Sequence, residues 1–329
     1  MYNIAVISGD GIGKEVMECC EYLLDKTGLN FSFEYGEAGF ECFNKNGTTL
    51  PDETLKIANK SDAVLFGAST STPGEPSPII NLRKELNVYA NIRPIKSYKG
   101  VKCLRDDIDF VIVRENTEGL YSQVEYGDED RMIAERIITR KASERISKVA
   151  FNLCEKRGES KVTCVHKSNV LKKTDGVFKE SFYNIAKQYP RIKTEDYYVD
   201  AMAMYLITQP QNFDVIVASN LFGDILSDES AGLVGGLGLA PSGNIGDHNG
   251  LFEPVHGSAP DIAGKNIANP CSMILSASMM LDYLGEGETA NSIKTAVEKV
   301  IAECKIRTPD LGGDASTMDV TKAIVKELI

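Results

Sequence analysis

The sequence Asn220-Leu-Phe-Gly-Asp224-Ile-Leu-Ser-Asp228 directly follows the mostly apolar run 213–218. The run predicts a buried strand, and the stretch after it predicts the opening of a helix, in which residues i and i+4 share a face. Asp224 and Asp228 are therefore expected beside the carboxyl end of a strand, where open α/β sheets bind ligands. Two carboxylates there suit Mg²⁺ or Mn²⁺, which completes its shell with water and substrate oxygens.

A solvated acidic face is the alternative interpretation of such an acid pair, because exposed acidic residues are common. The neighbouring Leu221, Phe222, Ile225 and Leu226 indicate instead a mostly buried segment. Unpaired carboxylates are costly to bury, so we expect the pair to meet a cation, either a metal ion or a basic side chain.

The whole chain has the composition of an ordinary globular enzyme. Its 329 residues predict two domains or one large α/β unit, and its net charge of −11 argues against non-specific nucleic-acid binding. The N-terminus enters a strand pattern without a targeting segment, and no apolar run approaches the ~20 residues of a membrane-spanning helix. We therefore expect a cytoplasmic protein without a membrane partner.

Several classes of site are disfavoured by motif spacing. The 8 cysteines form no C-x-x-C pair, which favours reduced, mostly buried thiols over disulfides or a zinc site. The 3 histidines lack H-E-x-x-H spacing, and neither a G-x-S-x-G nor a Walker A motif is present. Hydrolase and P-loop interpretations are therefore weak.

Apolar β runs alternate with helical patterns along the chain, which predicts a largely parallel α/β sheet. The β runs are 4–7, 63–66, 110–113, 162–165 and 215–218, and the helical patterns are 14–24, 142–154, 176–187, 272–283 and 290–304. The glycine-rich stretch 235–250 is too apolar for a flexible linker. It predicts a packed, functional loop or crossover.

A glycine turn, Gly9-Asp-Gly-Ile-Gly13, joins the first strand to the first helix. Strand, turn and helix resemble a dinucleotide fingerprint, but the spacing is G-x-G-x-G, and Asp10 would stand where a pyrophosphate approaches. A tight turn that needs glycine backbone freedom is the better interpretation.

Basic residues follow or close ordered segments. A structural ion pair is one interpretation for each of three arginines, Arg83, Arg93 and Arg114, and Glu115 is a candidate partner for Arg114. Three arginines together with an acidic metal pair suggest instead a substrate with two or more carboxylates. Lys167 follows a buried strand, where a lysine can be desolvated to act as a general base or can simply begin a surface loop. Asp200 can cap a helix or provide a third metal carboxylate.

Taken in order, these motifs resemble the β-decarboxylating dehydrogenases, the family of isocitrate, homoisocitrate and 3-isopropylmalate dehydrogenases. The resemblance covers essentially the full chain. The motifs are Gly9-Asp-Gly-Ile-Gly13, Leu82-Arg-Lys84, Tyr89-Ala-Asn-Ile-Arg-Pro94, Val113-Arg-Glu-Asn-Thr-Glu-Gly-Leu-Tyr121, His166-Lys-Ser-Asn169, Asp200-Ala-Met-Ala-Met204, Gly223-Asp-Ile-Leu-Ser-Asp228, Glu253-Pro-Val-His-Gly-Ser-Ala-Pro-Asp-Ile-Ala-Gly-Lys265 and Asp310-Leu-Gly-Gly-Asp314.

The resemblance implies an isopropylmalate-dehydrogenase-like two-domain α/β fold that is not a standard Rossmann fold. Residues 1–89 plus 235–329 would form a cofactor-binding domain from both chain ends. Residues 90–234 would form a central domain with the dimer interface and the metal and substrate residues. The family also implies a homodimer or tetramer with active sites shared between subunits.

The resemblance assigns roles residue by residue. Tyr121 and Lys167 would transfer protons, with Lys167 coming from the partner subunit. The metal, Mg²⁺ or Mn²⁺, would be held by Asp224, Asp228 and the partner's Asp200. Substrate binding falls to Ser77, Arg83, Arg93, Arg114 and Asn169. Cofactor binding falls to Glu253, His256, Gly257, Ser258, Ala259, Asp261 and Asn269.

The resemblance also implies the reaction, oxidative decarboxylation of a 3-substituted malate. Asp261 stands where NAD enzymes of the family have an acid, and a carboxylate accepts from ribose hydroxyls and repels a 2′-phosphate, so NAD is the expected cofactor. Ser77 favours homoisocitrate, whereas Ile79 and Ile80 suit the alkyl group of 3-isopropylmalate. Homoisocitrate is placed first, with 3-isopropylmalate or isocitrate as alternatives. Non-enzymatic alternatives are a regulatory subunit, which should lack catalytic positions, and an acidic scaffold for protein partners.

Overall fold

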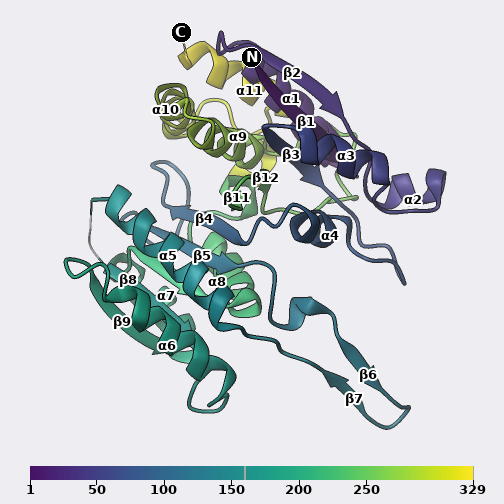
Figure 1. Ribbon diagram of the computed structural model, residues 1–329. Coiled ribbons are helices and arrows are strands. Elements are labelled where there is room, and N and C mark those ends of the chain that lie inside the picture. The colour runs from purple at the N-terminus through teal and green to yellow at the C-terminus, as the bar shows by residue number, and fades with distance from the viewer. Residues whose placement is uncertain (159–160, 329) are drawn as a thin grey trace. The chain divides into compact units, whose positions relative to one another are not determined.

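The computed structural model describes residues 1–158 and 161–328 and divides the chain into two compact units. Unit 1 comprises Met1–Val88, Ser97–Asp106 and the chain from Val234, and unit 2 comprises Tyr89–Lys96 and Asp107–Leu233. Each unit contains a sheet with helices packed on it (Figure 1). The predicted assignment of cofactor binding and subunit contact to separate domains stays a prediction.

The elements of each unit have the following bounds. Unit 1 has strands β1 Tyr2–Gly9, β2 Phe31–Tyr35, β3 Ala63–Ala68, β11 Pro241–Ile245 and β12 Gly250–Pro254, and helices α1 Gly13–Asp25, α2 Phe40–Asn46, α3 Asp52–Lys60, α4 Pro78–Glu85, α9 Cys271–Tyr283, α10 Gly287–Glu303 and α11 Thr317–Leu328. Unit 2 has strands β4 Ala90–Lys96, β5 Asp109–Glu115, β6 Glu125–Gly127, β7 Met132–Ala134, β8 Lys161–His166, β9 Lys193–Tyr198 and β10 Val215–Ala218, and helices α5 Arg140–Lys156, α6 Thr174–Ala186, α7 Val199–Thr208 and α8 Asn220–Leu233. Short 3₁₀ turns are η1 Leu120–Ser122, η2 Pro210–Asn212, η3 Leu237–Leu239 and η4 Pro309–Leu311.

In unit 1 the strands lie in the order β2-β1-β3-β12-β11, and all neighbours are parallel except β11 and β12. Alternate residues of β1 point to opposite faces of the sheet. Ile4 and Val6 pack in the cluster that contains α1, α9, α10 and α11, and Ala5 and Ile7 pack in the cluster of α3 and α4. Both faces of β1 are therefore buried, as its continuous apolar run predicts.

The glycine-rich stretch 235–250 is not a loop throughout, and this part of the sequence-based prediction is wrong. Residues Pro241–Ile245 form β11, which pairs antiparallel with β12 so that Ser242 faces Glu253 in register. The segment lacks β-branched residues until Ile245, so its local preference gives no strand signal. Pairing with β12, a tertiary interaction, makes the strand.

The turn after β1 confirms the glycine requirement. Gly9 and Gly11 have φ of +70° and +57°, values that L side chains rarely adopt. The carboxylate of Asp10 is engaged inside the protein, where it accepts hydrogen bonds from the backbone N–H groups of Phe40, Glu41 and Thr70 at 2.8–2.9 Å. The turn is thus a structural junction between β1, α2 and the chain after β3.

Gly11→Ala is expected to lower the free energy of unfolding by roughly 1–2 kcal/mol for its positive φ and by about 1–3 kcal/mol more for crowding. An alanine Cβ at this position would lie 2.1 Å from the backbone oxygen of Ser258. Gly47→Ala is the matched control, because its φ is +72° but no atom lies within 4 Å of the added Cβ. Urea unfolding measures both losses, and equal losses would contradict the crowding argument.

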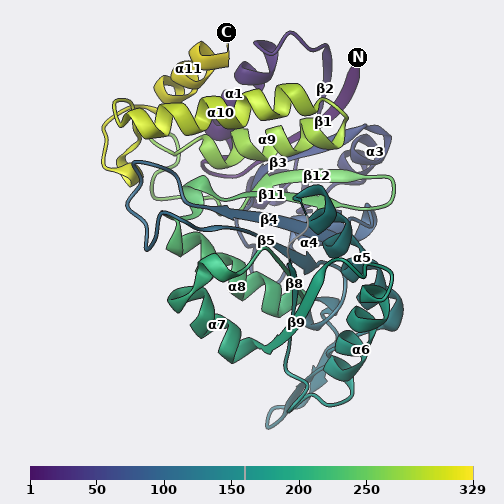
Figure 2. The same cartoon turned by 90° about the vertical axis from the view of Figure 1, so that its left-hand side faces the viewer.

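In unit 2 the strands lie in the order β4-β5-β10-β8-β9, with only β4 and β5 antiparallel. Val215 and Val217 of β10 pack in the cluster of α5 and α6. Figures 1 and 2 show α7 and α8 side by side on the opposite face of this sheet. The predicted α/β fold with a largely parallel sheet is confirmed, and β10 has the predicted bounds.

Strands β6 and β7 form a separate antiparallel hairpin in unit 2, drawn in Figure 1 as an arm that extends from the rest of the unit. In the described residues no helix is both long and apolar enough to cross a membrane. All eight cysteines are free thiols, and six of them are buried, as their scattered spacing predicts.

Candidate active site

Helix α8 begins at the carboxyl end of β10 and carries Asp224 and Asp228 one turn apart. Their side chains are 28% and 56% exposed, and Ile225 is 57% exposed. The prediction of a mostly buried segment is therefore wrong for this face. Helix α8 instead buries Leu226 and Ser227.

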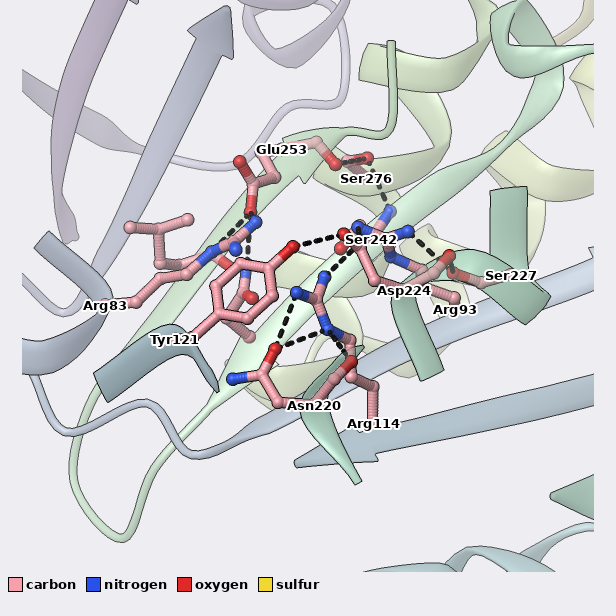
Figure 3. A network of polar contacts seen from close by, with 12 residues as sticks. Arg83, Arg93, Arg114, Tyr121, Asn220, Asp224, Ser227, Ser242, Glu253 and Ser276 are labelled. Atoms are coloured by element: carbon pink, nitrogen blue, oxygen red, sulfur yellow. Dashed lines mark hydrogen bonds and ion pairs between the residues drawn. The ribbon is translucent and has the colours of Figure 1, made fainter. Parts of the chain in front are cut away.

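Asp224 is contacted by three other predicted site residues, Arg93, Arg114 and Tyr121, all of which are labelled in Figure 3. Arg114 Nη1 lies 2.5 Å from Asp224 Oδ1, and the Tyr121 hydroxyl donates to Oδ2 at 2.5 Å. Arg93 Nη2 lies 3.4 Å from Asp224 Oδ1, and Arg93 Nη1 donates to Asp228 Oδ1 at 2.9 Å. Basic side chains thus meet both carboxylates, as the cost of burying charge predicts.

Arg114 is the most buried member of this group, with 1% of its surface exposed. Its Nε and Nη2 donate to Asn220 Oδ1 at 3.1 and 2.7 Å, and its Nε also reaches the Asn220 backbone oxygen at 3.0 Å. Asp224 is the carboxylate that pairs with Arg114 within the chain. Glu115, the partner suggested from the sequence, accepts hydrogen bonds from the backbone N–H groups of Thr117 and Glu118. A fixed guanidinium of this kind suits a ligand carboxylate.

The electrostatics of the group favour a protonated tyrosine. Burial raises the pKa of Tyr121, and the hydrogen bond to Asp224 raises it further against the opposing charge of Arg114. Partial loss of solvent contact raises the pKa of Asp228, and the charge of Asp224 adds to that effect while Arg93 opposes it. Tyr121 therefore keeps its proton near neutral pH and can act as an acid.

A divalent cation fits the donor set of α8. Asp224 and Asp228 offer carboxylate oxygens, the ligands that Mg²⁺ and Mn²⁺ prefer, and a cation would offset the mutual repulsion that raises the pKa of Asp228. Within residues 1–158 and 161–328, however, no three His, Cys, Asp or Glu side chains are grouped to hold a metal. Asp200 of the same chain therefore does not complete the site.

Lys167 and Asp200 form a separate pair in unit 2. Lys167 follows β8, and its Nζ donates to Asp200 Oδ1 at 2.5 Å. This hydrogen bond lowers the pKa of Asp200. Asp200 is the second residue of α7, whose N-cap is Tyr198, so the suggested N-cap role is wrong. Asn169, also predicted to bind substrate, is exposed on the loop after β8.

The predicted cofactor loop of unit 1 is hydrogen-bonded to the glycine turn. Ile12 N donates to Ser258 O at 2.9 Å, and the hydroxyls of Thr70 and Ser258 lie 2.7 Å apart. Asp261 and Gly257 are exposed, whereas Ser258 is buried, and Ala259 has φ of +37°. The loop is therefore anchored at Ser258 and presents the Asp261 carboxylate to solvent.

Other predicted cofactor residues have partners inside unit 1. Glu253 Oε1 accepts from Arg83 Nη2 at 2.6 Å and from Asn244 Nδ2 at 2.7 Å, with both acidic and basic side chains buried. Asn269 donates to Asp310 at 2.9 Å and accepts from Cys271 N at 3.0 Å. Glu253 and Asn269 therefore hold neighbouring side chains in place in this state.

His256 differs from them. Burial lowers its pKa, and its Nε2 is buried without a hydrogen-bond partner in the described part of the chain. His256 Nδ1 lies 2.9 Å from the Gly257 backbone oxygen and donates to it, so the Nε2 of the neutral imidazole can accept one hydrogen bond from a ligand. This observation fits the predicted cofactor loop.

The sequence analysis assigned no role to two residues, Asn220 and Ser227, that have clear structural roles. Asn220 holds two nitrogens of Arg114, and Ser227 accepts from Arg93 Nη1 at 2.6 Å. Both lie in the stretch that suggested the metal pair, but an amide and a hydroxyl on a helix carry no sequence signal. The partners are 106 and 134 residues away, so only the fold brings them together.

Comparisons with known proteins agree with this geometry. A family model described as isocitrate/isopropylmalate dehydrogenase matches residues 3–325. A 3-isopropylmalate/3-methylmalate dehydrogenase of Methanocaldococcus jannaschii is 59% identical over 100% of this chain and 99% of its own. A homoisocitrate dehydrogenase of the same organism is 52% identical over 99% of this chain and 97% of its own. The crystal structure of isocitrate dehydrogenase from Methylococcus capsulatus is 44% identical and superposes with a TM-score of 0.96 over 100% of this chain and 99% of its own. The chain belongs to the isocitrate/isopropylmalate dehydrogenase family and is an oxidatively decarboxylating dehydrogenase.

Proposed function

We propose that the protein uses NAD⁺ and Mg²⁺ or Mn²⁺ to oxidise and decarboxylate a 3-substituted malate. The observation that carries the proposal is Asp224 held between Arg114 and Tyr121, each at 2.5 Å. This arrangement combines a metal-binding carboxylate, a carboxylate-binding arginine and a proton donor. A regulatory subunit would not need all three, and Lys167 is also present.

In this proposal the side chains bind the substrate and move its protons. Arg93 and Arg114 bind carboxylates of the substrate, and Lys167 of the partner subunit removes the proton of the 2-hydroxyl. Tyr121 gives its proton to the carbon that loses CO₂. When bound by Asp224, Asp228 and Asp200 of the partner subunit, Mg²⁺ or Mn²⁺ supplies Lewis-acid polarisation of the substrate oxygens, and bound NAD⁺ accepts the hydride.

A homodimer would bring Lys167 and Asp200 of one chain to the metal carboxylates of another. Apolar residues exposed on the adjacent α7 and α8 support this interface: Met204 and Ile207 are 51% and 50% exposed, and Ile225 is 57% exposed. Large apolar side chains gathered on one face mark interaction surfaces. A second copy of the chain is the proposed partner, with dimer and tetramer both compatible.

Mixing two inactive variants tests the shared site. Lys167→Ala and Asp224→Asn protomers should form hybrid dimers with one site that carries both lesions and one that carries neither. Activity is then expected to recover to about a quarter of wild type, since half of the dimers are hybrids and each has one intact site of two. The absence of recovery, despite subunit exchange demonstrated by mass spectrometry, would show that each site lies within one chain.

NAD is the proposed cofactor because Asp261 is an exposed acid on the predicted cofactor loop. Asp261→Asn is expected to lower the preference for NAD⁺ over NADP⁺, expressed as a ratio of kcat/KM, by about tenfold or more, which corresponds to about 1.4 kcal/mol. The neutral amide of asparagine repels the 2′-phosphate of NADP⁺ less than a carboxylate does, and it accepts hydrogen bonds from the ribose hydroxyls of NAD⁺ less strongly. Asp52→Asn, an exposed acid in the first turn of α3, is the control. An unchanged ratio in Asp261→Asn would contradict the assignment.

Of the candidate substrates, we place a 3-alkylmalate such as 3-isopropylmalate first and homoisocitrate second. Sequence identity to the relatives named above is 59% for the 3-isopropylmalate/3-methylmalate enzyme and 52% for the homoisocitrate enzyme. This difference supports the proposed order, which is the opposite of the order expected from the sequence. Ile79 packs on the core of unit 1, and Ile80 is half-buried beside it.

Homoisocitrate remains the second candidate substrate because of Ser77. This half-buried residue is the N-cap of α4, yet its side chain makes no capping hydrogen bond, which leaves the hydroxyl for a ligand carboxylate. Measuring kcat/KM for isocitrate, homoisocitrate and 3-isopropylmalate decides the order. A preference for homoisocitrate of more than about tenfold, roughly 1.4 kcal/mol of transition-state binding, would restore the original order. Ser77→Ala should then affect homoisocitrate most.

A further inference from the structure

Arg136, which follows the β6–β7 hairpin, contacts the first turn of α6 and the start of α8, the helix that carries Asp224 and Asp228. Its side chain is 14% exposed. Its Nη1 forms an ion pair with Asp175 Oδ1 and donates to Thr174 Oγ1 at 3.1 Å, and its Nη2 donates to Ser219 Oγ at 3.1 Å. The guanidinium carbon also lies 5.2 Å from the centre of the Phe222 ring. No role for Arg136 follows from the sequence motifs.

On one side, the contacts of Arg136 lead to Lys167. The Asp175 side chain is 2% exposed and lies in the first turn of α6, and its Oδ2 accepts from the backbone N–H of Lys167 at 2.6 Å. The next N–H, that of Ser168, donates to the buried ring of His166 at 3.2 Å. Arg136 therefore fixes, through one carboxylate, the backbone that carries Lys167.

On the other side, the contacts lead to α8 and to the loop of Tyr121. Ser219 immediately precedes α8, and Phe222 lies in its first turn, so both precede Asp224 by at most five residues. Ile137, the neighbour of Arg136, forms an antiparallel bridge with Gly119, two residues before Tyr121. The planar guanidinium of Arg136 contacts Asp175 through Nη1 and Ser219 through Nη2 at the same time. A lysine ammonium has no pair of nitrogens that could reach both partners in this way.

We infer that Arg136 is a positioning residue that holds Lys167 and the start of α8 in a fixed relation through Asp175 and Ser219. The inference rests on the proposed function, in which Lys167 serves the partner's site while Asp224 and Tyr121 serve the site of their own chain. Arg136 then links residues that belong to the two different active sites of a dimer. A displacement of catalytic groups by about 1 Å can lower the rate by about 10²-fold.

Homodimers of three variants test the positioning role. Arg136→Gln and Arg136→Lys are expected to lower kcat by about 10²-fold, with KM changed less than about threefold. Arg136→Gln/Asp175→Asn replaces the ion pair by two amides, so it leaves no buried charge unpaired and guards against simple misfolding. Its melting temperature should lie near that of wild type while kcat stays low. Recovery of kcat in Arg136→Lys or in the double variant would overturn the inference.

Arg140→Gln is the matched control, because Arg140 also forms an ion pair with an α6 carboxylate, that of Glu180, but both side chains are about half exposed, at 47% and 61%. Its kcat is expected to match wild type. A loss in Arg140→Gln equal to that in Arg136→Gln would overturn the inference, because it would trace the effect to the packing of α6 in general.

Hybrid dimers test the link between the two sites. In a hybrid of Lys167→Ala and Asp224→Asn protomers, the single intact site takes Lys167 from the second protomer and Asp224 with Tyr121 from the first. Adding Arg136→Gln to either protomer should lower the recovered activity. A loss in only one placement, or in neither, would overturn the link. An inactive reference hybrid would contradict the shared site of the proposed function, and the homodimer measurements would still decide the role of Arg136.

Discussion

Replacing Lys167 by alanine is expected to lower kcat by about 10²–10⁴-fold, the usual contribution of a positioned general acid or base. Lys167 follows the buried strand β8, its Nζ lies 2.5 Å from Asp200 Oδ1, and its backbone N–H donates to Asp175. The substitution removes the proton acceptor proposed for the substrate hydroxyl. Steady-state rates with saturating NAD⁺, Mg²⁺ and substrate measure the loss, and KM for the substrate should change much less.

Lys161→Ala is the matched control for this variant. Lys161 lies at the other end of β8, its side chain is 22% exposed against 24% for Lys167, and it pairs with Glu195 of β9 at 2.8 Å. The two variants therefore remove the same charge from the same strand region. Loss of kcat in both would attribute the effect of Lys167→Ala to lost structure rather than to proton transfer.

Asp224→Asn is expected to raise the Mg²⁺ concentration needed for half-maximal activity by at least about tenfold, the lower end of the effect when a metal site loses a supporting interaction. The substitution keeps an oxygen that can accept from Arg114, and its amide nitrogen can donate to the Tyr121 hydroxyl; both partners lie 2.5 Å from the Asp224 carboxylate. The fold should therefore persist while one negative charge is removed. Titration of activity with Mg²⁺ and Mn²⁺ measures the change.

The control for the metal assignment is Asp109→Asn. Asp109 is an exposed acid of unit 2 that pairs with Arg157 at 2.8 Å, so the variant also removes one carboxylate from an arginine. Its metal dependence is expected to match wild type. If Asp224→Asn kept the metal dependence of wild type as well, Asp224 would not be a metal ligand.

The sequence predicted those parts of the fold that arise from local patterns. Apolar runs gave β10 with its observed bounds, and helical periodicity gave α1 and α9 to within about two residues, an accuracy better than is usual for element ends. It did not give β9, Lys193–Tyr198, because this strand at the end of the sheet is charged and has no apolar run. Local preference cannot report a strand that is created by pairing with β8.

The same division holds for the candidate site. The spacing of Asp224 and Asp228 predicted a shared helix face, and positions after strands predicted Lys167 and Arg114 as candidates. The intrachain partners could not be predicted. Arg114 contacts Asn220 across 106 residues of sequence, and Arg83 contacts Glu253 across 170. Only the completed topology brings these side chains into hydrogen-bonding distance, and no local pattern encodes it.

The most direct test of the proposed reaction is the joint measurement of NADH and CO₂ from one reaction mixture. Purified protein with NAD⁺, Mg²⁺ and 3-isopropylmalate or homoisocitrate is expected to release NADH and CO₂ in equal amounts, and a chelator should abolish both. Formation of NADH without CO₂ would contradict decarboxylation. The absence of NADH with isocitrate, homoisocitrate and 3-isopropylmalate alike would contradict the proposal that this chain oxidises a 3-substituted malate.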